Sequence, residues 1–132
     1  MSTRRQQELL ELFSTGRIPK FFGFTLSFDE QGHAHVNLPY NPNLDQPCGI
    51  HGGIVATLLD TAGWFAVAAQ SKTILVTTSE LSIHFLNPTQ ECDLHAEGWV
   101  VKAGKRTLIG EMRVSKSDGE VVAIGTGTFV VL

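Results

Sequence analysis

One acidic residue, Asp60, lies within a stretch from residue 54 to residue 69 whose other side chains are apolar, small or hydroxylic. The stretch is long enough to form a helix, and burying an ionised carboxylate costs several kcal/mol unless the charge is paired or hydrogen-bonded. A carboxylate that is partly desolvated is more basic than in water, which suits a general base near neutral pH. Its apolar neighbours on such a helix are Ile54, Leu58, Leu59 and Trp64.

The segment that leads into this stretch reads Cys48-Gly49-Ile50-His51-Gly52-Gly53. The first amide groups of a helix have no partner within the helix, and the helix dipole makes that end mildly positive. Because glycines carry no side chain to screen these amides, Gly52 and Gly53 could stabilise a carbonyl oxygen that becomes negative during a reaction. The alternative is that the glycines only permit a tight turn into the helix. A capping role explains His51 as well as chemistry does, and we do not expect it to be the general base.

The spacing of these groups constrains any shared site. Asp60 stands roughly 10 to 14 Å along the helix from Gly53 and His51, so one substrate carbonyl cannot touch both ends in one chain. A two-fold dimer with antiparallel helices would bring the glycines of one subunit to Asp60 of the other. The alternative is a structural carboxylate, held by Thr57, by Thr61 or by a hydroxyl on a neighbouring strand.

The surrounding pattern predicts one domain over residues 1–132, which opens with a helix within 1–16 that Gly16 and Pro19 close. Two strands follow around a turn at Asp29 to Gly32, then a loop over 41–50, an apolar helix over roughly 53–70, and about four more strands. This order indicates an α+β fold in which a curved antiparallel sheet wraps around one long central helix. A helix that is apolar on nearly all sides also requires a second chain to cover the rest.

Composition excludes several other classes of protein. The chain has 132 residues and a formal net charge of −3, and its Lys and Arg residues form no broad basic stripe, so we expect no nucleic-acid partner. No apolar run is long enough to span a membrane, and we expect a cytoplasmic protein. The cysteines and the remaining histidines show no metal-ligand spacing and predict neither a metal site nor a disulfide framework: Cys48, Cys92, His33, His35, His84 and His95.

Three segments together resemble the hotdog-fold acyl-CoA thioesterases of the phenylacetate-degradation type. They are HGGIVATLLD, in which the acid follows the histidine by nine positions, the strand TSELSIHFLNP, and the tail VVKAGKRTLIGEMRVSKSDGEVVAIGTGTF. The resemblance covers nearly everything after Phe24. It implies a sheet wrapped around a central helix, and dimers that join their sheets edge to edge and often pair into homotetramers.

The resemblance also implies roles for particular residues. The thioester carbonyl would accept a hydrogen bond from the amide of Gly53 or Gly52, and Asp60 of the other subunit would act as general base or nucleophile. A hydroxyl on the following strand would position the water. Thr78 matches that position better than Thr77. No cofactor is implied beyond coenzyme A as part of the substrate. Two basic residues are expected to contact its phosphates, although two solvated turn charges explain them equally well: Lys105 and Arg106.

One position departs from the resemblance. Related enzymes usually carry Asn or Gln six residues before the histidine, where Asp45 stands here. A second carboxylate close to Asp60 would raise the pKa of one of the two. Either the loop is shifted so that Gln46 or Asn43 supplies the amide, or the site is altered.

The sequence therefore predicts a homo-oligomeric hydrolase that cleaves acyl-CoA to a free acid and coenzyme A at a dimer interface. Its acyl pocket is expected to be apolar, with Trp64 and Phe85 as candidate lining residues. Two alternatives stay open, a dehydratase or hydratase of the same fold and a non-catalytic acyl-CoA-binding protein.

Overall fold

The computed structural model describes residues 2–132. The elements that frame the molecule are two N-terminal helices, one long helix and a six-stranded sheet, with a short hairpin between β2 and α3. In chain order they are α1 (Arg4–Ser14), α2 (Arg17–Phe22), β1 (Thr25–Phe28), β2 (Ala34–Leu38), the 3₁₀ helix η1 (Pro42–Leu44), β3 (Asp45–Gln46), β4 (Gly49–Ile50), α3 (Gly52–Ala68), β5 (Val76–Phe85), β6 (Leu94–Ala103), β7 (Thr107–Lys116) and β8 (Val121–Val131).

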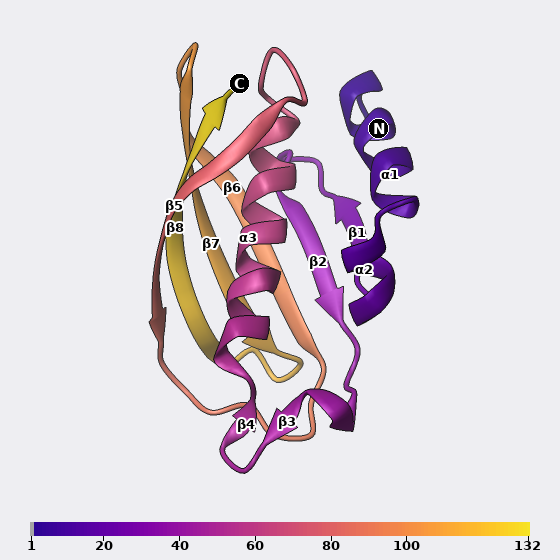
Figure 1. Cartoon of the computed structure of the whole chain (residues 1–132), viewed down its shortest axis with the longest axis vertical. Helices are drawn as coiled ribbons and strands as arrows, with labels where there is room; N and C mark the ends of the chain where they lie inside the picture. The colour runs from indigo at the N-terminus through magenta and orange to yellow at the C-terminus, as the bar shows by residue number, and fades with distance from the viewer. Residues whose placement is uncertain (1) are drawn as a thin grey trace.

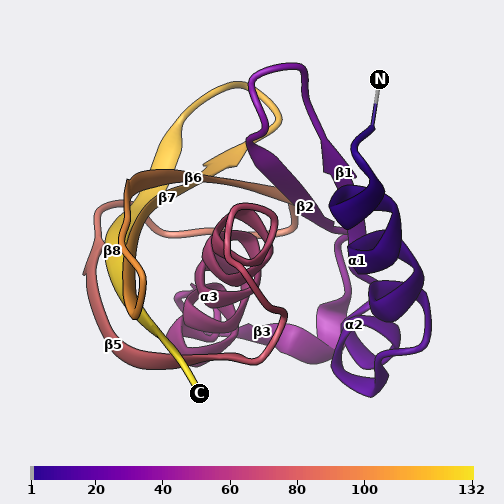
Figure 2. The ribbon, with the colours of Figure 1, turned by 90° about the horizontal axis from the view of Figure 1, so that it is seen from above.

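The large sheet has the strand order β1-β2-β6-β7-β8-β5, and each neighbouring pair is antiparallel. Figure 1 shows α3 lying along this sheet, and the end-on view in Figure 2 shows the sheet curling around the helix. This is the hotdog architecture, and it confirms the predicted curved sheet around a central helix. The strands on both sides of α3 also occur in the predicted order.

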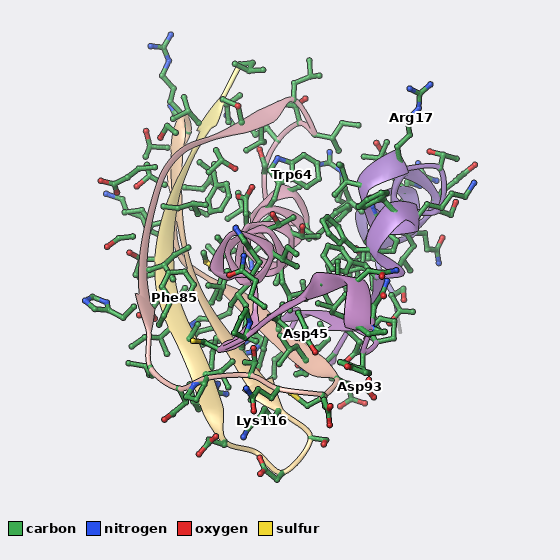
Figure 3. All side chains as sticks on the ribbon, turned by 60° about the horizontal axis from the view of Figure 1, so that its bottom comes forward. Arg17, Asp45, Trp64, Phe85, Asp93 and Lys116 are labelled. Atoms are coloured by element: carbon green, nitrogen blue, oxygen red, sulfur yellow. The ribbon has the colours of Figure 1, made fainter. Side chains whose placement is uncertain are left out.

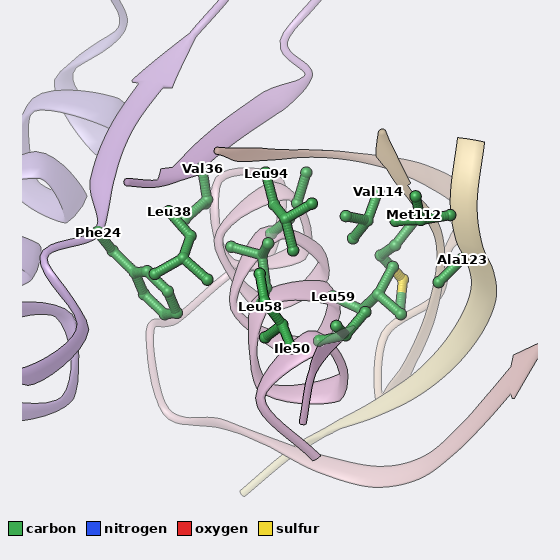
Figure 4. Close-up of a cluster of buried hydrophobic side chains, with 14 residues drawn as sticks. Phe24, Val36, Leu38, Ile50, Leu58, Leu59, Leu94, Met112, Val114 and Ala123 are labelled. Atoms are coloured by element: carbon green, nitrogen blue, oxygen red, sulfur yellow. The ribbon is translucent and has the colours of Figure 1, made fainter. Parts of the chain in front are cut away.

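The core lies between α3 and the concave face of the sheet (Figure 4). Leu58, Leu59 and Ala62 are completely buried there against side chains of β2, β6, β7 and β8. The helix can approach β6 closely because Gly98 has no side chain: a Cβ atom at this position would stand 2.5 Å from the carbonyl oxygen of Ala62. Close packing of this kind places α3, and every polar group on it, rigidly against the sheet.

The N-terminal region contains one helix more than predicted. α1 begins with a capping box in which Thr3 and Gln6 bond each other's backbone amides. It ends before Gly16 as expected, but residues 17–22 form α2, which includes Phe21 and Phe22 at the start of the first predicted strand. Pro19 is the third residue of α2, where the missing amide hydrogen has no intrahelical partner to lose. Gly23 then ends α2 in the left-handed conformation with φ of 76°.

The segment predicted as a loop over 41–50 contains η1 and the hairpin of β3 and β4. Gly49 in this hairpin has φ of 120°, and a Cβ atom there would overlap the carbonyl oxygen of Thr89 at 2.0 Å. The Ile50 amide donates to that same oxygen at 2.8 Å. This contact ties the start of α3 to the loop after β5.

Candidate active site

Several residues of α3 line the one face of the helix that the sheet leaves partly open. They follow one another at helical spacing and all are exposed or half-buried: Gly53, Thr57, Asp60, Thr61 and Trp64. We call these five residues the open stripe. Gly53 and Asp60 are seven residues apart, which places them on the same side of α3 and about 10 Å apart along its axis. Every candidate group on α3 except Gly52 and His51 belongs to this stripe.

Asp60 is held from the neighbouring strand. The Thr78 hydroxyl of β5 donates a hydrogen bond to Asp60 Oδ1 at 2.8 Å. Burial raises the pKa of Asp60 above its ordinary value of 3.8, and the Thr78 hydrogen bond opposes this rise. Within residues 2–132, Oδ2 has no hydrogen-bond donor, so this oxygen is free to take a proton.

The other two hydroxyls considered for Asp60 are used elsewhere. Thr57 donates to the Gly53 carbonyl at 2.9 Å, and Thr61 donates to the Thr57 carbonyl at 2.7 Å. Both are turn-to-turn bonds within α3. Of the three structural partners proposed from sequence, only the strand hydroxyl contacts the carboxylate. This contact fits a structural role and a positioning role equally.

A pocket of about 430 Å³ lies beside Asp60. Trp64 forms part of its wall, and its indole N–H donates to the Val76 carbonyl at 2.8 Å, which fixes the ring against β5. The opposite wall comes from α1, α2 and the turn between them, which the sequence did not implicate in the site: Leu12, Phe13, Thr15, Gly16, Ile18 and Pro19. The pocket is mainly apolar, with the carboxylate as its one acidic group.

His51 caps α3. Its Nδ1 accepts a hydrogen bond from the Gly53 amide at 2.9 Å, so the capping role considered from sequence is present in the structure. The Gly53 amide is therefore already engaged. Within residues 2–132 the amide of Gly52 has no hydrogen-bond acceptor. Of the two predicted carbonyl-binding amides, Gly52 is the one available in this conformation.

The helix start borders a second pocket of about 330 Å³. Phe85 at the end of β5 lines it, and its ring would stand 3.7 Å from a Cβ atom at Gly52. Trp64 and Phe85, which the sequence analysis assigned to one acyl pocket, thus line different pockets of the chain. Figure 3 shows the two rings well separated. The candidate site consists of two halves, one around Asp60 and one around Gly52.

Asp45 and Gln46 form β3, beside the start of α3. Asp45 Oδ2 accepts a hydrogen bond from the Tyr40 hydroxyl at 3.0 Å, and Oδ1 is buried without a partner in the described chain. The pKa of Asp60 responds to burial and to Thr78, with no contribution from Asp45. The expected coupling of two neighbouring carboxylates is therefore not present within one chain. Gln46 is exposed.

The remaining predicted residues lie apart from Asp60. Thr77 is exposed and precedes Thr78 on β5, so the two side chains face opposite sides of the strand. Lys105 and Arg106 are exposed in the turn between β6 and β7. Figure 1 places this turn at the end of the molecule where α3 ends, whereas α3 begins, with Gly52, at the other end.

The thioesterase superfamily matches residues 49–123, which is more than half of the chain and includes all of α3. A Saccharolobus solfataricus protein described as a candidate esterase is 32% identical over 125 residues, covering 94% of this chain and 83% of that protein. A Halobacterium salinarum protein with the same description is 34% identical over 122 residues, covering 83% of this chain and 80% of its own. The chain belongs to the thioesterase superfamily, and this membership supports a hydrolase of thioesters or esters.

Solved structures agree with the fold. A Bacillus halodurans protein, solved with CoA, is 31% identical with a TM-score of 0.82 and covers 100% of this chain and 96% of its own. The Escherichia coli PaaI protein of the phenylacetic acid degradation operon has a TM-score of 0.87 at 23% identity, covering 96% of this chain and 91% of its own. This second likeness shows the fold alone. Among the described residues, the longest apolar helix falls short of a membrane span.

Proposed function

We propose that the protein is an acyl-CoA thioesterase whose active site is completed by a second copy of the chain. The observation that carries this proposal is the half-buried Asp60 carboxylate, anchored through one oxygen by Thr78 and open through the other to an apolar pocket. The only predicted carbonyl-binding amides lie about two turns away on the same helix. A site that uses both groups on one thioester needs two helices.

The proposed reaction follows from these two half-sites. The Gly52 amide of one subunit donates to the thioester oxygen, where negative charge develops. Asp60 of the other subunit takes a proton from water as the water oxygen bonds to the carbonyl carbon. The C–S bond then breaks, the sulfur leaves as the thiolate of coenzyme A, and the proton passes to the products. Direct attack by Asp60, through an anhydride, remains the second route.

The sheet supports the two-chain site through its free edge. β5 is a terminal strand of ten residues with one unpaired side, whereas β1 at the other edge has four residues and lies beside α1. A long unpaired edge readily pairs with a strand of another chain. Thr78 lies on β5, so a dimer formed along this edge would place the Asp60 half-site close to the subunit boundary. We propose this homodimer, and pairing of two dimers as the further assembly.

Coenzyme A is proposed as the leaving group because the Bacillus halodurans relative was solved with CoA and shares 31% identity over the whole chain. In the proposed dimer with antiparallel helices, the turn with Lys105 and Arg106 of one subunit would lie toward the helix start of the other. These cations would then contact the phosphates of coenzyme A. Within the superfamily, the HGG segment and its spaced acid support the phenylacetate-degradation type.

Asp45 fits this proposal as a hydrogen-bond acceptor. Its buried Oδ1 has no partner in the described chain, and an unsatisfied buried acceptor costs about 1–3 kcal/mol. Tyr40 already holds the other oxygen. Because Oδ1 has almost no accessible surface, Asp45 would have to reorient before a donor of the substrate or of a second subunit could reach it. An Asn at this position could donate as well as accept, and Asp45 can only accept while ionised.

The function is tested by free-thiol release from short, long, branched and aromatic acyl-CoAs. We expect turnover by the wild type and a loss of at least a hundredfold in Asp60→Asn, because general-base groups contribute 10²–10⁴ in rate. Asp118→Asn, in the exposed turn between β7 and β8, serves as the matched control and should retain activity. Binding of acyl-CoA without thiol release would replace the proposal with a binding protein. An enoyl or hydroxyacyl thioester as product would indicate the dehydratase or hydratase.

A further inference from the structure

A second group of chemically active side chains lies on the outer face of the sheet, away from α3. One donor atom each of Asp29, His35 and Glu97 lies within 4.8 Å of the other two. The strand register accounts for this convergence: His35 of β2 stands opposite Glu97 of β6, and Asp29 directly follows β1 at the turn into β2. His35 and Glu97 are 62 positions apart in the chain, so no local sequence pattern indicates that they lie close together.

Asp29 is oriented by its own turn. Its Oδ1 accepts backbone hydrogen bonds from Gln31 and His33, each at 2.9 Å, as in an Asx turn. The other oxygen, Oδ2, lies 2.7 Å from His35 Nε2. The turn thus fixes the carboxylate and leaves one oxygen directed at the imidazole.

His35 is oriented by a chain of hydrogen bonds along the same face. Asn37 Oδ1 can only accept, so His95 must donate to it from Nδ1, at 2.7 Å. With its proton on Nδ1, a neutral His95 ring accepts at Nε2, which lies 2.9 Å from His35 Nδ1. Because Nδ1 of His35 carries the proton of this hydrogen bond, Nε2 is the nitrogen that can offer a lone pair once its own proton leaves. An outer partner of this kind fixes the tautomer of histidine ligands in metal sites.

Glu97 is held from both sides. Arg113 donates to Oε1 at 3.1 Å, and His33 Nδ1 lies 2.6 Å from Oε2. Carboxylate and imidazole groups thus converge on one point beside Arg113, and both groups are ligands that divalent transition metal ions accept.

We propose that Asp29, His35 and Glu97 bind a divalent transition metal ion, with Zn²⁺ as the representative ion and His33 as an adjacent fourth donor. Imidazole and carboxylate ligands bind Zn²⁺ at about 2.0–2.2 Å, so tetrahedral ligands stand about 3.4 Å apart. The donor atoms here lie from 2.7 Å apart to 4.8 Å apart, so small side-chain rotations bring them to that spacing. On binding, Zn²⁺ takes the Nε2 lone pair of His35, and the Nε2 proton passes to solvent.

This site is separate from the proposed thioesterase centre. Its residues lie on the face of β2 and β6 opposite to Leu38, Leu94 and the core, whereas Asp60 lies on α3 inside the curved sheet. The inference does not rest on the proposed function. It differs from the expectation from sequence, because the spacing of His33 and His35 predicted no metal site.

The test is Zn²⁺ titration of tag-free, chelator-treated protein by isothermal calorimetry at neutral pH. We expect one Zn²⁺ per chain, and at least tenfold weaker binding in His35→Gln and in Asp29→Asn, in line with the usual effect of disturbing a metal site. His84→Gln is the matched control, because His84 is exposed on β5 and lies outside the cluster. Its affinity should equal that of the wild type. Circular dichroism establishes that each variant is folded.

Trp99 provides a second readout. Its ring stacks on His33, with centroids 5.5 Å apart and an angle of 25° between the planes. Zn²⁺ should therefore change Trp99 emission in a Trp64→Phe background, with the same midpoint as the calorimetric titration. No saturable heat at millimolar Zn²⁺ would overturn the proposal. So would equal affinity in folded His35→Gln and wild type, which would indicate adventitious surface binding.

Discussion

Asp60 carries an energetic cost that its proposed role would explain. Because burial raises its pKa above 3.8, the folded state binds the proton more tightly than the unfolded state. The stability gained from this tighter proton binding is fully present at a pH below the pKa of Asp60 in the unfolded state. It is lost as the pH rises through the higher pKa of Asp60 in the folded state. At neutral pH the ionised carboxylate therefore destabilises the fold. Functional groups often carry such a cost.

Asp60→Asn should consequently be more stable than the wild type at pH 7, by the order of 1 kcal/mol. Asn keeps an Oδ1 that can accept the Thr78 hydrogen bond, so the substitution removes mainly the buried charge. Thermal unfolding followed from pH 3 to pH 8 measures this difference. It should shrink toward zero below pH 3.8, where both states of the wild type are protonated. A variant less stable than the wild type at pH 7 would show instead that the carboxylate supports the fold.

We propose Thr78 as a positioning residue, because its hydroxyl donates a hydrogen bond to Asp60 Oδ1. Removing this bond in Thr78→Val takes away the interaction that lowers the pKa of Asp60. The acid limb of the kcat/KM profile should therefore move to higher pH, and kcat should fall. Thr78→Ser retains the hydroxyl and should restore the wild-type profile. Thr77→Val is the matched control on the opposite face of β5. An unchanged acid limb of the kcat/KM profile in Thr78→Val would show that Thr78 does not influence the pKa of Asp60.

At the scale of elements, the long apolar stretch and the turn signal at residues 29–32 were sufficient to predict the central helix and the two strands before it. The structure adds α2 and the β3–β4 hairpin. α2 was missed because Pro19 indicates a helix end, whereas here it occupies the first turn of a new helix. The hairpin depends on Thr89, a contact 39 residues away that no local pattern contains.

The site was predictable to the same extent. The resemblance assigned Thr78 to positioning a water, and a hydroxyl on a neighbouring strand was one of the structural partners considered for Asp60; in the structure Thr78 donates directly to the carboxylate. The wall of the Asp60 pocket was not predicted, because the residues of α1 and α2 reach it only through tertiary packing. For His51 the sequence left a capping role and a chemical role equally open, and in the structure its side chain accepts a hydrogen bond from the Gly53 amide.

The residues of α1 that line the pocket beside Asp60 allow a test of whether this pocket binds the acyl group. Leu12 lines the pocket and is 43% exposed, so Leu12→Ala should cost little stability. Removing this apolar contact should raise KM for long or aromatic acyl-CoAs severalfold, by about 1–2 kcal/mol at most, with kcat little changed. Leu132→Ala, at an exposed position outside the pocket, should have wild-type KM. Equal KM values in Leu12→Ala and wild type would remove α1 from the acyl site.

At the scale of the whole molecule, the proposed function requires a second chain to bring the two half-sites together. Gly52 and Asp60 stand about 12 Å apart along α3, and Trp64 and Phe85 line separate pockets. The open stripe of α3 and the free edge of β5 are the surfaces that a second copy would cover. The outer cluster at Asp29, His35 and Glu97 lies elsewhere, so a dimer along β5 would leave it exposed.

The most direct test of the two-chain site is recovery of thiol release when two inactive variants are mixed. Gly52→Pro removes the one amide hydrogen at the first position of α3, where proline is tolerated, and His51 has the extended ψ of 130° that a residue before proline adopts. Gly52→Ala keeps the amide and is the control. The second variant in the mixture is Asp60→Asn. Gly52→Pro alone and Asp60→Asn alone should each be inactive.

After subunit exchange, verified by mass spectrometry of differently labelled chains, random pairing puts one intact site in each heterodimer. Half of the dimers are then heterodimers with half of their sites intact, so about a quarter of the wild-type thiol release should return. Recovery to that level would show that Gly52 of one subunit works with Asp60 of the other. Verified heterodimers without activity would contradict the two-chain site.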